Sequence, residues 1–151
     1  MIGLDLAPER LRPLWLIHDA HEARIGDMVF PVHQAAVAVE AEQFPGCNSS
    51  IFQGVWAELK RRHDVVIHAA AGIALPTKAE RDALKAIDLR CLAIEHRDFH
   101  RPSERRWQHE LDGIEAGRGT VRRFMPPDKV ADQLAARFYR YLPALQAEAE
   151  F

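Results

Sequence analysis

A short segment near the start of the chain holds residues that could do chemistry together. His18, Asp19, Glu22 and Asp27 supply one imidazole and three carboxylates. On a helix, His18 and Glu22 lie one turn apart on the same face, and Asp19 reaches Glu22 at three residues. The preceding stretch, 14–17, is strongly apolar, so polar groups at its edge lose solvation unless a divalent cation compensates them. The alternative is that the carboxylates of Asp19 and Glu22 are solvated and that His18 is a core residue whose polar atoms are hydrogen-bonded.

The His-Asp pair is weak evidence by itself, because a chain with 8 His residues among 151 forms such pairs by chance. A second pair, His63-Asp64, occurs further on, and we interpret it as accidental. We interpret His21, His96, His100 and His109 as surface or packing residues. What distinguishes the first pair is its surroundings, LIHDAHEARIGD (16–27), with Pro31 shortly after.

These surroundings resemble the central motif of the HD-domain metal-dependent phosphohydrolases, closest to the branch of bacterial 5′-deoxynucleotidases and phage-type phosphohydrolases. A second block resembles the same branch downstream and contains AAGIALP (70–76), LKAIDLR (84–90) and AIEHRD (93–98). Two blocks in the right order are far more specific than either block alone. The resemblance covers about 5–100, and the C-terminal third adds little.

The resemblance implies a ligand set and a catalytic pair. His18 and Asp19 would ligate a metal ion, and Asp88 would be the distal carboxylate ligand. Glu22 and Asp27 would act beside the metal as catalytic residues. Mixed nitrogen and oxygen donors suit one divalent ion, which is Mn, Co, Fe, Zn or Mg, and the spacing does not choose among them. The substrate-binding residues remain unknown.

Two features qualify this ligand set. Another interpretation of Asp88 is a solvated acid or the partner of Arg90. Its position one helical turn after Leu84 nevertheless turns it partly inward. The family pattern also has a further His ligand on an earlier helix, and this sequence has no His before His18. Either the chain is truncated or the lineage lost this ligand. His21, His33 or His63 could substitute for it, with no geometric reason to prefer one.

The function implied is metal-dependent hydrolysis of phosphate monoesters, most simply nucleoside or deoxynucleoside 5′-monophosphates. In this mechanism Glu22 orients or deprotonates a water, and Asp27 positions substrate or helps the leaving group. The alternative is a catalytically weak or inactive HD-fold binding or assembly domain that has lost its first ligand. Alarmone hydrolysis lacks support, because that branch usually carries an acidic pair where this chain has Glu22-Ala23.

The elements that must position these residues are predicted to be helices, because Ala and Leu are abundant and strand-like alternation is nearly absent. We expect an all-α, HD-domain-like bundle of five or six helices. The first covers 8–25 and ends at Gly26, with Pro13 bending it or delaying its start. The clearest start is the capping box of Thr77 and Glu80, from which a helix reaches Phe99. Further helices are expected over 31–39, from Ser49 or Ser50 to 63, over 64–71 and over 128–146.

Several details accompany these helices. Ile51, Val55 and Leu59 share one apolar face, and 42–48 is expected to form a loop. Asp128 is expected to cap the last helix, and 101–127 to be an irregular excursion. The apolar residues expected to face inward from the last helix are Val130, Leu134, Phe138 and Tyr141 or Leu142.

Composition limits the remaining possibilities. A chain of 151 residues forms one domain, 1–151, and 20 Lys and Arg against 22 Asp and Glu exclude a general electrostatic hold on nucleic acid or anionic membrane. The longest uncharged stretches, 28–39 and 65–77, are too short to span a bilayer, and no secretory signal is expected. Cys47 and Cys91 show no pattern, which favours a cytoplasmic protein. The expected partner is a small phosphate ester, and a homo-oligomer is possible.

Overall fold

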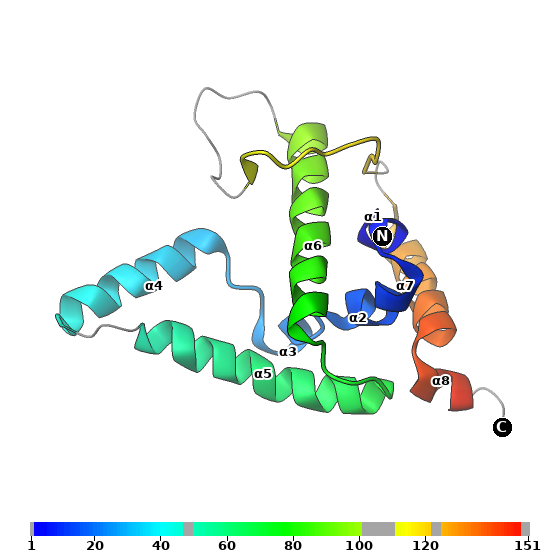
Figure 1. Cartoon of the computed structure of the whole chain (residues 1–151), viewed down its shortest axis with the longest axis horizontal. Coiled ribbons are helices and arrows are strands. Elements are labelled where there is room, and N and C mark those ends of the chain that lie inside the picture. Colours follow the sequence, from blue (N-terminus) through cyan, green and yellow to red (C-terminus); the bar gives the residue numbers. More distant parts are fainter. Residues whose placement is uncertain (1, 47–49, 101–110, 122–124, 149–151) are drawn as a thin grey trace.

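The computed structural model describes residues 2–46, 50–100, 111–121 and 125–148, and the secondary structure of these residues is helical, without a strand. The expectation of an all-α protein is therefore confirmed. Figure 1 shows α6 at the centre, with α1, α2 and α7 on one side of it and α4 on the other. The elements are α1 (Ile2–Leu6), the 3₁₀ turn η1 (Glu9–Leu11), α2 (Arg12–Ile17), α3 (Glu22–Ile25), α4 (Phe30–Gln43), α5 (Ile51–Ala71), α6 (Lys78–Phe99), α7 (Pro127–Tyr141) and α8 (Pro143–Glu148).

The expected helix over 8–25 is not continuous, so this prediction was wrong. Pro13 lies in the first turn of α2, which delays the helix start as anticipated, but α2 ends at Ile17 and α3 begins at Glu22. Between them the chain forms a turn with i→i+3 hydrogen bonds, from Ala20 N to Ile17 O (3.1 Å) and from Glu22 N to Asp19 O (2.9 Å). Hydrogen bonds of this kind wind the backbone more tightly than an α-helix does and bring side chains three residues apart closer to alignment.

The two long helices follow their local signals. Ser50 caps α5 by accepting a hydrogen bond from Gln53 N (3.1 Å), and Gly72 ends this helix with a left-handed φ of 72°. Thr77 and Glu80 form the expected capping box of α6, which ends at Phe99 as predicted. Ser49, the other expected cap, lies outside the described residues, as do Cys47 and His109.

Helix α4 is longer than the expected 31–39, because its end is tied to the next helix. The Glu40 carboxylate accepts hydrogen bonds from Ser50 Oγ (2.6 Å) and from Phe52 N (3.1 Å), so it satisfies free amides at the start of α5. The expected face of Ile51, Val55 and Leu59 is nevertheless exposed, with Val55 at 65%. The apolar pattern is present, but this face of α5 is open to solvent.

The C-terminal helix expected over 128–146 is also divided. Pro143 disfavours a helical conformation at the preceding residue, and Leu142 is extended (φ −101°, ψ 114°) between α7 and α8. Asp128 is not the cap as expected, because the helix begins at Pro127 and Asp128 lies in its first turn. Val130 and Leu134 are exposed, contrary to the prediction, whereas Phe138 packs against buried Leu142.

Helix α2 lies at the meeting point of the buried side chains. Leu14 packs with Leu11 and with Leu84 of α6, while Ile17 packs with two buried residues from α5 and the α7–α8 junction. These last two residues are Ala71 and Leu142. The core therefore encloses the helix that ends directly before the His-Asp pair.

The segment 111–121 returns along α6 and is held at the end of that helix. Arg97 donates to the carbonyl oxygens of Gly117 (2.9 Å) and Gly119 (2.5 Å), and Asp98 accepts from Val121 N (2.8 Å). This agrees with an irregular excursion where it is described; 101–110 and 122–124 lie outside the described residues. Among the described residues, none of the helices combines the length and apolar character needed to cross a membrane.

Gly3 tests how tightly the first helix packs on α2. A Cβ atom there would lie 1.9 Å from Cζ2 of Trp15, whereas a Cβ atom at Gly54 in α5 would meet nothing within 4 Å. We expect Gly3→Ala to lower the free energy of unfolding by about 1–3 kcal/mol through overpacking. The control Gly54→Ala should raise it by about 0.5–1 kcal/mol, because alanine favours the helix. Urea denaturation measures both, and a Gly3→Ala protein of unchanged stability would contradict this packing.

Candidate metal centre

The three residues expected to bind metal come from two separate elements and lie around the same space. His18 and Asp19 lie in the turn after α2, and Asp88 lies in the middle of α6. All three line both of two cavities, of about 550 and 780 Å³. Asp88 is paired with Lys85 (Nζ to Oδ2, 3.0 Å), not with the Arg90 that the sequence had suggested. His18 and Asp88 do not belong to the group of donor atoms within 4.8 Å of one another found among the described residues, so what the three residues share is the lining of these cavities.

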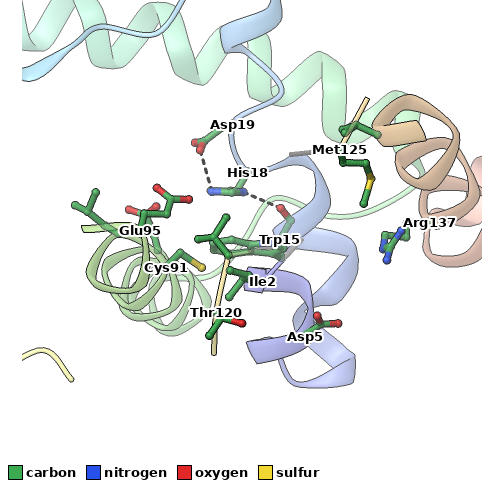
Figure 2. Close-up of a pocket in the computed structure, with 15 residues that line it drawn as sticks. Ile2, Asp5, Trp15, His18, Asp19, Cys91, Glu95, Thr120, Met125 and Arg137 are labelled. Carbon is green, nitrogen blue, oxygen red and sulfur yellow. Dashed lines mark hydrogen bonds and ion pairs between the residues drawn. The ribbon is translucent and has the colours of Figure 1, made fainter. Parts of the chain in front are cut away.

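His18 is held in a single orientation by its neighbours. Its Nδ1 lies 2.7 Å from the carbonyl oxygen of Trp15, and its ring stacks on the Trp15 ring with centroids 4.2 Å apart. Because a carbonyl oxygen only accepts, Nδ1 must carry the hydrogen. Nε2 therefore faces Asp19, whose Oδ2 lies 2.9 Å away, as Figure 2 shows.

His18 and Asp19 each change the pKa of the other. Burial pulls the pKa of His18 down, but the hydrogen bond and charge of Asp19, the Trp15 carbonyl and the charge of Asp88 outweigh it, so the pKa is raised above 6.5. The hydrogen bond from His18 lowers the pKa of Asp19 despite its partial burial. In the absence of a cation, the pair is therefore stabilised by a proton held between an imidazole and a carboxylate.

One group of possible metal-ligating atoms lies close together among the described residues. Asp19, His21 and Glu22 each offer a donor atom, and these atoms lie within 4.8 Å of one another. This His, Asp and Glu group could hold a metal ion, and its mixture of nitrogen and oxygen suits transition metals as well as Mg.

Of the two expected catalytic acids, Glu22 belongs to this group and Asp27 does not. Glu22 begins α3, and its burial, followed by the charges of Asp19 and Asp27, raises its pKa. Asp27 is exposed and follows Gly26, whose φ of 79° ends α3. Neither Glu22 nor Asp27 lines the two cavities. A carboxylate with a raised pKa is a better proton acceptor near neutral pH than an ordinary one.

Sequence reasoning assigned no role in the site to Asp64 and His68, and it named His21 only as one of three possible substitutes for the missing ligand. His21 is 3% exposed, and its Nδ1 lies 2.9 Å from Oδ1 of Asp64. The pair His63-Asp64 was interpreted as accidental, yet Asp64 is the partner of this buried imidazole. His68 is also buried, with Nδ1 2.9 Å from the carbonyl oxygen of Ala74. The spacing of three residues between His18 and His21 is the sequence feature that could have indicated a role for His21.

The two cavities differ in chemistry. The smaller one, drawn in Figure 2, has Trp15, Cys91 and Thr120 among its lining residues and several aliphatic side chains. Burial, together with the charges of Glu95 and Asp88, raises the pKa of Cys91 to about 11, so its thiol stays protonated and is a poor nucleophile. The larger cavity has a basic wall formed by Lys60, Arg61, Arg81 and Lys85.

Comparison with known proteins gives no family assignment: no protein-family model matches the chain, and no significant match was found among the curated proteins or the solved structures.

The His18–Asp19 pair has a measurable pH signature in metal-free protein. Because the folded pKa of His18 is raised above 6.5, its protonation stabilises the fold below pH 6.5, and this contribution is lost as the pH rises through the raised value. We expect Asp19→Asn to lower the His18 pKa, measured by NMR titration in the presence of a chelator. The control Asp27→Asn should leave it unchanged. An unaltered His18 pKa in Asp19→Asn would contradict the pairing.

Proposed function

We propose that this protein is a metal-dependent phosphohydrolase that acts on phosphate monoesters, with nucleoside or deoxynucleoside 5′-monophosphates as the substrate class. The observation that carries the proposal is the position of His18, Asp19 and Asp88 in the lining of two cavities, one of which has a basic wall. The resemblance of two separate sequence blocks to HD-domain phosphohydrolases supports the same chemistry and the same residues.

In this proposal His18, Asp19 and Asp88 hold one divalent ion. When bound, the ion lowers the pKa of a coordinated water and neutralises charge on the phosphate oxygens. Glu22 accepts the proton of the attacking water, a role that suits its raised pKa. As the oxygen of that water bonds to phosphorus, the ester P–O bond breaks and the leaving oxygen takes a proton to become an alcohol. Asp27, beside Glu22, positions the substrate or assists the departing alcohol.

The cavities suggest how such a substrate lies. Lys60 and Arg81 line the larger cavity, and neither forms an ion pair within 4 Å among the described residues. They are therefore suited to a phosphate group. The smaller cavity, with Trp15 and Thr120, suits the alcohol portion, because an aromatic ring and a hydroxyl match the faces and edges of a nucleoside.

A second candidate is an HD-like binding or assembly domain with weak or absent catalysis. The ion pair between Lys85 and Asp88 favours it, because an ammonium group at 3.0 Å competes with a metal for the distal carboxylate. Metal analysis followed by a panel of nucleotides separates the two candidates. Stoichiometric metal with release of inorganic phosphate supports the enzyme, and metal-free protein without hydrolysis supports the binding domain.

Asp88 provides the first test of the ligand set. We expect Asp88→Ala to abolish stoichiometric metal binding, because the distal carboxylate is removed, while the helical circular dichroism stays nearly unchanged. Asp82→Ala is a matched control, since Asp82 is an exposed acid of the same helix that pairs with Lys78. Metal content is measured after dialysis by elemental analysis. Unchanged metal in Asp88→Ala would remove this residue from the site.

Glu22 provides the test of the proposed base. Glu22→Gln should keep the metal and lose on the order of 10²–10⁴ in kcat, because the amide does not accept the proton of the attacking water. Glu58→Gln, at an exposed position paired with Arg61 and Arg62, serves as control. Phosphate release and metal content are measured on the same samples. Loss of metal from Glu22→Gln would make Glu22 a ligand instead of a base.

A further inference from the structure

The turn after α2 orients two histidines in the same way. His18 and His21 are three residues apart in a turn that contains i→i+3 hydrogen bonds from Ala20 N to Ile17 O and from Glu22 N to Asp19 O. In each ring Nδ1 is anchored, on the Trp15 carbonyl oxygen for His18 and on Asp64 for His21. Nε2 of His18 is paired with Asp19 Oδ2 (2.9 Å), whereas the described residues give Nε2 of His21 no hydrogen-bond partner. Both residues line the larger cavity, together with Asp19 and Asp88.

The environment of His21 leaves its second nitrogen in an unfavourable state. An ionised Asp64 only accepts hydrogen bonds, so Nδ1 of His21 carries the hydrogen, and a neutral ring then has a lone pair on Nε2. The ring is 97% buried, so water does not compensate this lone pair easily. A donor atom of His21 also lies within 4.8 Å of carboxylate oxygens of Asp19 and Glu22. Two carboxylates and an imidazole this close together are stabilised by a cation placed among them.

We propose that His21, oriented by Asp64, is a ligand of the metal centre and supplies a second imidazole beside His18 and Asp19. A carboxylate that accepts Nδ1–H of a metal-bound histidine is the common supporting arrangement in metal sites, because it fixes the tautomer and raises the basicity of Nε2. Asp64 on α5 occupies this position. The inference rests on the proposed function, since the ion is the one assigned there to His18, Asp19 and Asp88.

Two imidazoles change which ions the centre prefers. Imidazole nitrogen favours Zn, Co and Fe, whereas Mg favours sites made of oxygen donors. With His21 as a ligand, the centre should bind Co²⁺ more tightly than Mg²⁺. Removal of His21 should reduce the difference between the affinities for Co²⁺ and Mg²⁺, because oxygen atoms then make up a larger share of the ligands. This selectivity is independent of catalytic activity and can be measured on the bound ion directly.

The experiment is titration of the metal-free full-length chain with Co²⁺, followed by calorimetry and by the visible absorption of the bound ion. We expect one equivalent in the parent protein, a change of the Co²⁺ spectrum in His21→Gln, and Kd increases of at least about 10-fold in His21→Gln and about 10–100-fold in Asp64→Asn. His68→Gln is the control for a buried, anchored histidine in the same cavity. His63→Gln is the control for the exposed neighbour of Asp64. Both controls should bind Co²⁺ as the parent does.

The outcomes separate this inference from the proposed function. If the parent binds Co²⁺ and both His21→Gln and Asp64→Asn bind it equally well, His21 is a structural partner of Asp64 and the inference is wrong, while the proposed function stands. If the parent binds no Co²⁺ at millimolar concentration, the metal-dependent function fails and the inference fails with it. Circular dichroism is recorded for each variant, and Asp64→Asn decides the outcome if His21→Gln is unfolded.

Discussion

The tight turn between α2 and α3 is the local feature on which the candidate centre depends. Ile17 is buried against Ala71 and Leu142, so the end of α2 is fixed in the core, and the next residue, His18, emerges at the cavity wall. In a continuous α-helix, side chains three residues apart are about 60° out of line. The i→i+3 hydrogen bond from Glu22 N to Asp19 O brings Asp19 and Glu22 closer to alignment.

Local signals in the sequence predicted the helices that are defined by their own ends. The capping box at Thr77 and the left-handed Gly72 mark α6 and α5 because each satisfies backbone groups within a few residues. The break after Ile17 was not predictable in this way, because tertiary burial determines it. The same holds for Val55, whose apolar pattern predicts a buried face, although burial depends on whether another element covers it.

The candidate site likewise contains residues that local sequence motifs indicated and residues that they did not. His18, Asp19 and Asp88 were proposed from motifs, and the structure places them around the same two cavities. The partnership of His21 with Asp64 joins α5 to the turn after α2, and two residues 43 positions apart give no local pattern. A lone buried histidine and an accidental-looking His-Asp pair are each uninformative in the sequence. Their meaning comes from the packing that brings them within 2.9 Å.

Helix α6 connects the charge of the centre to the chemistry of the cavities. Asp88 faces both cavities, and Lys85, three residues earlier, lines the larger one. Their ion pair is well exposed, with 61% of the Lys85 side chain and 41% of the Asp88 side chain accessible, and such pairs contribute only about 0–1 kcal/mol. Asp88 can therefore exchange this partner for a stronger one at little cost in stability. Lys85 would then join Lys60 and Arg81 on the basic wall, so occupation of the centre would strengthen the anion-binding character of the cavity beside it.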